Sequence, residues 1–513
     1  MSDRLTSVNP ATGDLVHETA IDDASQVRQA IAKAREAQPA WAERSPSQRL
    51  VALEPALTRI VDDRNAFAEA VTAEAGKPVA EALVADVMPT LEAGAFLDRH
   101  AEAILEPPAQ RLDNMLLKDR KSHLRREPAG LVAIVAPWNY PLAIPASQAL
   151  FALAAGNAVV LKPSERTPGV GQRFADAIAD ADLPEGLFQL VQGPGDPTGR
   201  ALVEADPDVL LFTGRAETGQ AIADEVGPDT ATVLELGGND PMLVLDDANL
   251  SLAARGATWA AFANAGQTCS AVERLFVDRT RAGDLEDRLA KHADALRVGP
   301  GDREDVDVGP MITDAAVERT MSHIEDALDR GARLVAGGQR RDDLGPRFVQ
   351  PAVLADVPPQ ARVMREETFG PVLPVATVEG EDEALERANA SCYGLTASVW
   401  TTRPDRGDEL AGRLEAGTVT INDHAYTYAA CETPWGGVKD SGAGHTHGRA
   451  GLEALTQLKH VNHASPNRPG SPWWFPYDQD LRRMGDEGLA FLYGSKKEGL
   501  ASVAPAVRRL LGP

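Results

Sequence analysis

The chain has 513 residues, of which 43% are hydrophobic and 25% are charged, and its formal net charge is −25. This length indicates two or three domains, and the composition is that of a globular protein with sizeable cores. The negative charge argues against nucleic acid or an anionic membrane as a partner, because both repel an acidic surface.

The number of cysteines and the length of the apolar runs indicate the cellular compartment of the protein. Cys269, Cys392 and Cys431 are too few and too scattered for a disulfide framework or a Cys-based zinc site. No metal site is predicted, since the histidines at 445 and 447 are more typical of a polar loop. The chain begins without a signal-peptide pattern, and no run has the ~18 apolar residues that span a bilayer. We therefore expect a cytoplasmic protein.

Predicted helices fill residues 24–107, with Ala-rich amphipathic stretches at 23–42 and 64–75. Residues 108–129 are polar and charged, as expected of a segment that leaves the domain and returns. From residue 130 onward, short apolar runs alternate with helical segments such as 170–180 and 217–225. These runs are typical of buried parallel strands, and they lie at 130–136, 157–161, 187–191, 209–212 and 233–236.

This alternation predicts a doubly wound parallel sheet that binds ligands at the carboxyl ends of its strands. A second α/β unit begins after Gly238 with a predicted strand at 241–245, and it runs to about Gly437. The end of the chain differs in character. It carries an aromatic cluster at 472–477 and a predicted amphipathic helix at 489–511.

Two side chains in these segments are suited to covalent catalysis. Cys269 lies in the small, polar sequence Gly-Gln-Thr-Cys-Ser, and Glu235 stands at the end of the apolar run Val-Leu-Glu. A thiolate can attack a carbonyl carbon, and a carboxylate can deprotonate the water that later hydrolyses the thioester. A lone cysteine is usually a buried structural residue, but these small, polar neighbours favour an accessible thiol.

Further motifs accompany these residues. They are Pro-Trp-Asn-Tyr-Pro at 137–141, Lys-Pro-Ser-Glu at 162–165, Leu-Glu-Leu-Gly-Gly at 234–238, Glu-Glu-Thr-Phe-Gly-Pro-Val at 366–372 and Pro-Trp-Gly-Gly at 434–437. In their order and spacing the chain resembles the aldehyde dehydrogenase superfamily, from Asn9 to about His460. The resemblance implies an α/β fold class with a Rossmann-like dinucleotide-binding domain, an α/β catalytic domain and a small oligomerisation element. The expected boundaries are 1–110 with 129–237, then 238–440, then 111–128 with 441–513, the last including a C-terminal extension.

The resemblance implies catalytic roles for three residues. Cys269 would attack the aldehyde carbon, and Glu235 would activate water for deacylation. The Asn139 amide would donate to the oxyanion, together with the backbone N–H of Cys269. From its neighbours alone, Asn139 is more simply a turn cap between two prolines. The implied reaction oxidises an aldehyde to its carboxylic acid with NAD(P), through a cysteine thiohemiacetal and a thioester.

Lys162 and Glu165 resemble the pair that binds the adenosine ribose. A carboxylate there accepts from the ribose hydroxyls and repels a 2′-phosphate, so NAD is favoured as the cofactor and NADP remains possible. Taken alone, the pair is a weak surface ion pair. Glycines at 193, 195 and 199 do not have the spacing of a dinucleotide fingerprint, so that segment is predicted to be a plain loop.

Other cofactor contacts follow from the same resemblance. The loop before residue 217 would place a helix N-terminus at the pyrophosphate, although Arg215 stands where the family more often has Ser. Glu367 would bind the nicotinamide ribose, and the Phe369 ring would pack against the nicotinamide. The cofactor-binding residues implied in full are Lys162, Glu165, Pro137, Trp138, Gly195, Phe212, Thr213, Gly214, Gly219, Gly237, Glu367 and Phe369.

A mostly apolar substrate tunnel is expected, formed by Tyr140, Ile144, Thr268 and Trp435, and it suits an aliphatic or aryl aldehyde. Succinic semialdehyde dehydrogenases usually carry arginines where this chain has Ala263 and Ser147, which makes a semialdehyde the second candidate substrate. CoA-acylating relatives typically lack the glutamate at 235. A CoA-acylating dehydrogenase and a non-catalytic member of the fold also stay open as functions. Since relatives are dimers or tetramers, a homodimer or homotetramer is expected. The aromatic tail is expected to dock on a partner subunit, with covering the tunnel mouth as the alternative.

Overall fold

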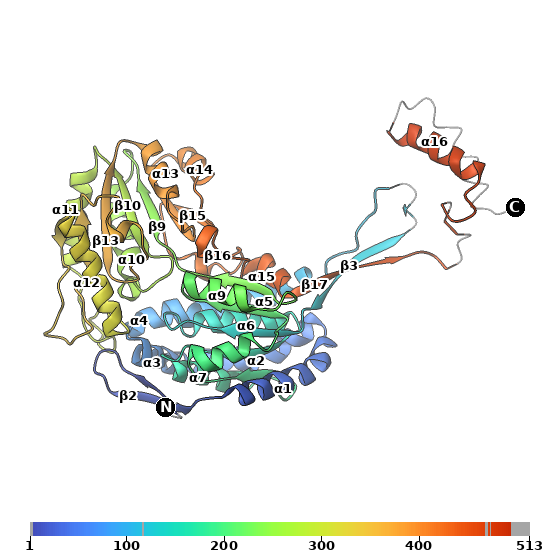
Figure 1. The fold of residues 1–513 in the computed structure, drawn as a ribbon, viewed down its shortest axis with the longest axis horizontal. Coiled ribbons are helices and arrows are strands. Elements are labelled where there is room, and N and C mark those ends of the chain that lie inside the picture. The colour runs from blue at the N-terminus through green and yellow to red at the C-terminus, as the bar shows by residue number, and fades with distance from the viewer. Residues whose placement is uncertain (1–3, 115–116, 119, 467–469, 472, 494–513) are drawn as a thin grey trace. The chain divides into compact units, whose positions relative to one another are not determined.

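The computed structural model describes residues 4–114, 117–118, 120–466, 470–471 and 473–493. Its contacts divide the chain into two compact units. The larger unit comprises Met1–Glu106 and Arg126–Leu458, and the smaller comprises Pro107–Arg125 and Lys459–Pro513. The larger unit contains two extended sheets, each covered by helices (Figure 1).

The first sheet has six strands in the order β16-β8-β7-β4-β5-β6. Only the edge pair of β16 and β8 is antiparallel. The sequence predicted five of these strands, β4 to β8, as continuous apolar runs, whereas β16 was not predicted. Every residue of β5 is buried, because helices cover both faces of a parallel sheet. The strands are β4 (Leu131–Val135), β5 (Ala158–Lys162), β6 (Phe188–Leu190), β7 (Val209–Thr213), β8 (Ala231–Glu235) and β16 (Gly442–Ala443).

Helices from the start of the chain pack against this sheet. Asp23 and Gln26 form a capping box that starts α1, and Ser45 and Gln48 form another that starts α2. Trp41 is fully buried, and its Nε1 donates to the carbonyl of Leu153 in α6 at 2.8 Å, which ties α1 to the sheet layer. The helices are α1 (Ala24–Ala42), α2 (Pro46–Asp62), α3 (Arg64–Ala75), α4 (Val79–Ala82), η1 (Leu83–Val87), α5 (Met88–Leu105), α6 (Ala143–Ala154), α7 (Pro168–Ile178), η3 (Gly195–Gly199), α8 (Arg200–Val203) and α9 (Ala216–Glu225). A hairpin of β1 (Arg4–Val8) and β2 (Leu15–Ala20) precedes them.

The second sheet has seven strands in the order β11-β12-β13-β10-β9-β14-β15, and only β11 is antiparallel to its neighbour. Alternate residues of β9 point to opposite faces. Met242 packs into the core formed with α10 and α11, whereas Leu243 packs into the core formed with α13 and α14 (Figure 1). The strands are β9 (Asp240–Val244), β10 (Val272–Asp278), β11 (Arg333–Ala336), β12 (Ala352–Ala355), β13 (Val372–Val378), β14 (Thr396–Trp400) and β15 (Thr418–Ile421). The helices are α10 (Leu250–Phe262), η4 (Ala263–Gly266), α11 (Ala282–Asp294), α12 (Asp314–Asp329), η5 (Arg362–Met364), α13 (Glu381–Asn389), α14 (Pro404–Ala411), η6 (Thr427–Ala429) and η7 (Lys439–Ser441).

These two sheets confirm the predicted α/β class with a Rossmann-like parallel sheet. The segment 441–458, which the sequence assigned to the oligomerisation element, lies in the larger unit. Its strand β16 pairs with β8, and its helix α15 (Gly448–Ala454) packs on α5 and α6. A Cβ at Gly442 would come within 1.9 Å of the Leu234 carbonyl, so a residue without a side chain allows β16 to approach.

The smaller unit contains most of a two-stranded sheet. Strands β3 (Lys121–Pro128) and β17 (Thr456–His463) pair, and the rings of His123 and His463 stack at 5.3 Å. The unit also contains α16 (Gln479–Tyr493). Most of the helix predicted at 489–511 lies outside the described residues, which end at 493 in this region. No helix in the described part of the chain is both long and apolar enough to cross a lipid bilayer.

Candidate active site

Cys269 lies on a tightly folded loop between α10 and β10. Asn264, Ala265 and Gly266 precede it with φ angles of 53°, 56° and 71°, all in the left-handed region. The Gln267 side chain fixes this turn, because its Nε2 donates to the Asn264 carbonyl at 3.0 Å and its Oε1 accepts from the Ile312 N–H at 2.9 Å. The loop thereby holds the predicted nucleophile in one place.

Two cavities meet at Cys269, which lines both of them. The wider cavity has a volume of about 380 Å³, and the narrower one has a volume of about 250 Å³. The wider cavity also contains Asn139 and Glu235 in its wall, so the three predicted catalytic residues lie together. A ligand in each cavity would therefore have access to the same sulfur atom.

The wider cavity fits a dinucleotide. Residues 213–217 line it at the start of α9, whose N-cap residue Arg215 makes no side-chain cap, so the first helical N–H groups are available to an anion. Trp138 and Phe369 supply aromatic walls, with their rings edge to face at 5.6 Å. A Cβ at Gly237 would lie 2.7 Å from the carboxylate oxygens of Glu367, so this glycine lets the two segments approach.

The structure brings some of the predicted cofactor residues into this wall and not others. Those in the wall are Pro137, Trp138, Thr213, Gly214, Gly237, Glu367 and Phe369. Those outside it are Lys162, Glu165, Gly195, Phe212 and Gly219. The segment 193–199, predicted to be a plain loop, ends in the irregular turn η3 at 195–199, where Asp196 has an extended backbone (φ −120°, ψ 122°), and the chain then continues into α8.

Lys162 and Glu165 lie beyond the end of β5. The Lys162 ammonium is 3.8 Å from the Glu165 carboxylate, and it also donates to the Pro163 carbonyl at 3.0 Å. Lys162 is 2% exposed, and burial lowers its pKa despite the nearby Glu165 carboxylate. A buried lysine with a partly exposed carboxylate beside it retains hydrogen-bonding groups for a polar ligand.

A buried acid that the sequence analysis missed holds the Phe369 segment. Glu273, in β10, accepts from the backbone N–H groups of Thr368 at 2.8 Å and of Phe369 at 2.7 Å. Phe369 has a φ of 50°, so its ring direction depends on this support. The signal was a pair of adjacent charged residues, Glu273 and Arg274, inside a buried strand. Arg319 and Tyr393, also missed, complete the cavity wall from α12 and from the loop before β14.

Asn139 is almost fully buried between the two sheets. Its Nδ2 donates to the Gln267 carbonyl at 3.1 Å, and its own backbone carbonyl accepts from Asn264 Nδ2 at 3.0 Å. An amide nitrogen carries two hydrogens, so one remains available to an oxyanion beside Cys269. These two hydrogen bonds hold the Asn139 side chain and its backbone carbonyl in place.

Glu235 terminates β8 and accepts three side-chain hydrogen bonds. Thr213 Oγ1 donates to its Oε2 at 3.0 Å and Gln148 Nε2 donates to the same oxygen at 3.3 Å, while Thr446 donates to Oε1. Burial raises the pKa of Glu235 to about 6, although the three bonds oppose that rise. At neutral pH the carboxyl group is therefore ionised, with a basicity suited to general-base catalysis.

Burial also affects the pKa of the Cys269 thiol. It raises the pKa of Cys269 well above the usual range, and the nearby carboxyl groups of Glu235, Asp240 and Glu367 add to the rise. The thiol is thus protonated in this environment, and forming the thiolate requires a proton acceptor.

The narrower cavity is lined mainly by apolar and aromatic side chains, and all four predicted tunnel residues belong to it. Tyr140 and Thr268 share a hydrogen bond of 2.7 Å at its wall. Below the Tyr140 ring lies a buried ion pair that the sequence did not reveal, in which Lys77 donates to Asp86 at 2.7 Å. The full lining is Glu81, Val84, Ala85, Met88, Pro89, Tyr140, Ile144, Trp259, Ala260, Ala263, Thr268, Cys269, Ser270, Ala425, Tyr426, Tyr428, Ala429 and Trp435.

No group of three or more metal-ligating side chains occurs among residues 4–493 wherever the structure describes them. The groups that line the two cavities around Cys269 include a thiol, an amide and carboxyl groups.

Comparison with known proteins agrees with this geometry. The family model described as the aldehyde dehydrogenase family matches residues 1–461. A Methylomonas protein named 4,4'-diapolycopene aldehyde oxidase is 37% identical, over 96% of this chain and 91% of its own length. A Mycolicibacterium smegmatis protein, whose name provisionally assigns it as a succinate-semialdehyde dehydrogenase (NADP(+)), is 36% identical over 88% of this chain and 87% of its own length.

Solved structures give the same result. An aldehyde dehydrogenase of Mycobacterium tuberculosis complexed with NAD+ superimposes with a TM-score of 0.85 and 31% identity, covering 90% of this chain and 95% of that one. The chain belongs to the aldehyde dehydrogenase family. It is an NAD(P)-dependent oxidoreductase that converts an aldehyde to a carboxylic acid.

Proposed function

We propose that Cys269, Asn139 and Glu235 perform the reaction at the junction of the two cavities. The Cys269 thiol loses its proton to solvent, and its sulfur forms a bond to the aldehyde carbon. The carbonyl electron pair moves to oxygen, where the Asn139 amide and the Cys269 N–H donate to it. The observation that carries this proposal is that Cys269 lines both cavities, with Asn139 and Glu235 in the wall of the wider one.

The second half of the reaction releases the acid. The bound dinucleotide supplies a hydride acceptor, and loss of hydride leaves the thioester on Cys269. Ionised Glu235 takes a proton from water as the water oxygen attacks the acyl carbon. The carbon–sulfur bond breaks, the electron pair returns to Cys269, and the carboxylic acid leaves.

The wider cavity is proposed as the dinucleotide site. Its start-of-helix N–H groups and Arg215 suit the pyrophosphate, and Phe369 and Glu367 suit the nicotinamide end. Lys162 and Glu165 are assigned to the adenosine ribose, and Glu165 favours NAD over NADP. Phe212, Gly195 and Gly219 act through the shape of neighbouring backbone, because they lie outside the wall.

The narrower cavity is proposed as the tunnel for an aliphatic or aryl aldehyde. Val84, Met88 and Trp259 line it and are also 57%, 46% and 52% exposed, so apolar surface continues past its mouth. The Methylomonas relative, named for the long apolar diapolycopene aldehyde, supports an apolar substrate. The mycobacterial relative supports a semialdehyde instead, but no arginine or lysine lines this cavity to bind a second carboxylate.

An aldehyde panel tests the proposal. NADH or NADPH formation is measured with an alkanal series, benzaldehyde and succinic semialdehyde, with Cys269→Ala as the control. Apolar aldehydes should be oxidised with higher kcat/KM than succinic semialdehyde, and added CoA should not raise the rate. Folded protein that binds NAD but oxidises none of these aldehydes would favour a non-catalytic member of the fold. A preference for succinic semialdehyde would exclude the apolar assignment.

We also propose a homodimer or homotetramer working in the cytoplasm. The oligomer is supported by the family, and the compartment by the three cysteines, all of which are free. The mass of the purified protein by light scattering tests the first proposal, and cell fractionation tests the second.

A further inference from the structure

A series of hydrogen bonds leads from the Glu235 carboxylate to Thr446 and His447, neither of which lines the two ligand cavities. Thr446 Oγ1 donates to Glu235 Oε1, and a carboxylate oxygen can only accept. The same Oγ1 lies 3.3 Å from Nδ1 of His447. Because the hydroxyl hydrogen is already committed to Glu235, His447 must be the donor in this second bond. The chain therefore runs from His447 through Thr446 to Glu235.

His447 is built to remain neutral in this role. It is 2% exposed, and burial lowers its pKa to about 4. A neutral imidazole has one N–H, so donation from Nδ1 leaves Nε2 as a bare acceptor. In the described part of the chain, His447 Nε2 and Gln148 Oε1 are both buried and have no hydrogen-bond partner.

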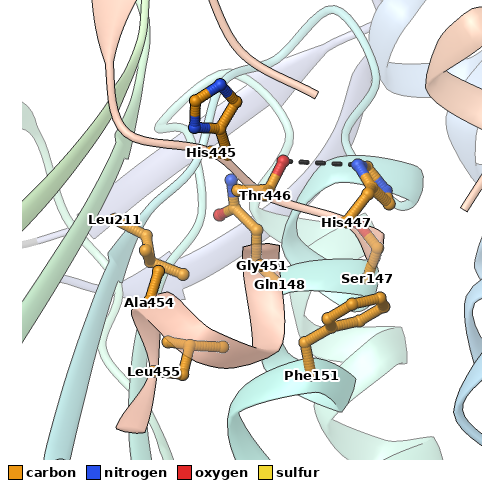
Figure 2. Close-up of a pocket in the computed structure, with 10 residues that line it drawn as sticks. All are labelled: Ser147, Gln148, Phe151, Leu211, His445, Thr446, His447, Gly451, Ala454 and Leu455. Carbon is orange, nitrogen blue, oxygen red and sulfur yellow. Dashed lines mark hydrogen bonds between the residues drawn. The ribbon is translucent and has the colours of Figure 1, made fainter. Parts of the chain in front are cut away.

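Both of these acceptors belong to side chains that line one small cavity, which Figure 2 shows with Thr446 joined to His447. The cavity has a volume of about 10 Å³, close to the minimum for one water molecule. A water molecule is a donor, and a donor is what His447 Nε2 and Gln148 Oε1 lack. The chemistry of this cavity thus suits a single water that donates to the far end of the chain.

The backbone around Thr446 is fixed on two sides. Its N–H and carbonyl exchange hydrogen bonds of 2.8 Å with Trp435, a wall residue of the narrower cavity. His447 has a φ of 61°, an unusual conformation for a residue with a side chain, and its ring packs edge to face on Tyr428 at 4.5 Å. A strained residue held by such contacts is typical of a functional segment.

We propose that Thr446 and His447 are positioning residues for Glu235. His447 donates to Thr446, and Thr446 donates to the Glu235 carboxylate. These hydrogen bonds keep the carboxylate ionised and aimed at the hydrolytic water. This inference rests on the proposed role of Glu235 as the deacylating base. Neither residue touches substrate, so their effect is expected in the deacylation half of the reaction.

The pH dependence follows from the groups that face Glu235. Thr446, Thr213 and Gln148 donate to it, and the titratable groups beside it are Cys269, Tyr428 and His447. Cys269 and Tyr428 have raised pKa values and His447 a lowered one, so all three are neutral near pH 6. Removing the Thr446 hydroxyl leaves the carboxylate less stabilised, which raises the pKa of Glu235 above about 6.

The test compares Thr446→Val with Thr446→Ser, which restores the hydroxyl, and with Thr258→Val as a matched control. Thr258 is also buried, but its hydroxyl donates to a helix carbonyl at 2.7 Å. Thr446→Val should move the acid limb of the kcat–pH profile up by about one unit, which lowers kcat about tenfold well below pH 6 and about twofold at pH 7. The initial burst of NADH should be retained, because acylation precedes the affected step. Thr446→Ser should recover most of the loss, and Thr258→Val should show none.

His447→Asn and His447→Ala extend the test one bond further. Asn tolerates a positive φ and keeps a donor, so it should lose less deacylation rate than Ala. Equal losses of burst and steady-state rates in Thr446→Val, or an unchanged pH profile, would overturn the proposal. So would a loss that Thr446→Ser does not recover.

A readout without turnover separates this inference from the proposed function. The Glu235 carboxyl band is titrated by infrared difference spectroscopy against Glu235→Gln. An upward shift in Thr446→Val supports the contact whether or not any aldehyde is oxidised, and no shift refutes it. Failure of every aldehyde together with a clear infrared shift would count against the proposed reaction alone.

Discussion

The two cavities that meet at Cys269 differ in what forms their walls. The wider one is lined by backbone turns, glycines and charged side chains from both sheets, whereas the narrower one is lined mainly by apolar side chains. In the proposed assignment, the first would recognise groups that every dinucleotide shares, and the second would recognise whatever chain carries the aldehyde. Dinucleotide binding and aldehyde choice should therefore be separable by mutation, with Cys269 as the point where they join.

The largest effect should come from that junction. Cys269→Ala removes the nucleophile of the first half-reaction, which is also the leaving group of the second, and should lower kcat by about 10⁴-fold or more. NAD binding, followed by tryptophan fluorescence, should stay within about twofold, because the wall of the wider cavity is otherwise unchanged. Residual aldehyde oxidation close to the unmodified rate would exclude Cys269 as the nucleophile.

Glu235→Gln should lower steady-state turnover by about 100- to 10,000-fold by removing the base. The thioester should accumulate and be visible as an added acyl mass on intact protein. In the unmodified protein kcat should fall as pH drops through about 6, because protonation of Glu235 removes the base as pH falls below its pKa. A variant that turns over normally and holds no acyl group would contradict this role.

A charge at the mouth of the narrower cavity should weaken aldehyde binding without changing NAD binding. Val84→Asp should raise the KM for a long alkanal about tenfold, since a carboxylate replaces apolar contact, while the NAD Kd is unaffected. Val51→Asp is the matched control, because Val51 is similarly exposed on α2 and lies away from both cavities. Equal changes in the two variants would show that the mouth has no special part in substrate binding.

The smallest effect is expected on the cofactor side. Burial and the neighbouring Arg215 charge lower the pKa of Arg319, so two guanidinium groups converge on the wider cavity. Arg215→Ser should raise the NAD Kd about fivefold and weaken its dependence on salt, as expected for loss of one exposed charge contact. Isothermal titration with NAD and with ADP-ribose measures this. An unchanged Kd across salt concentrations would remove Arg215 from the phosphate site.

The sequence predicted the parts of this site that local motifs encode. Cys269, Asn139 and Glu235 each follow a recognisable element, and the parallel strands follow from their apolar runs. Partners contributed from distant segments were not predictable, because pairing across hundreds of residues leaves no local signal. Thr446 on Glu235 and Glu273 beneath Phe369 are of this kind. The turn at 195–199 was missed for the opposite reason, since its glycines and proline indicated a loop.

Backbone contact at the nucleophile has an evolutionary consequence. A Cβ at Gly238 would lie 2.3 Å from the Cys269 carbonyl, and one at Gly266 would lie 2.3 Å from the Gly370 carbonyl. Peptide groups, rather than side chains, thus fix where the sulfur lies. Residues of the narrower cavity can be exchanged without touching these contacts. The substrate range of such a scaffold can diversify through tunnel substitutions while the reacting atom keeps its position.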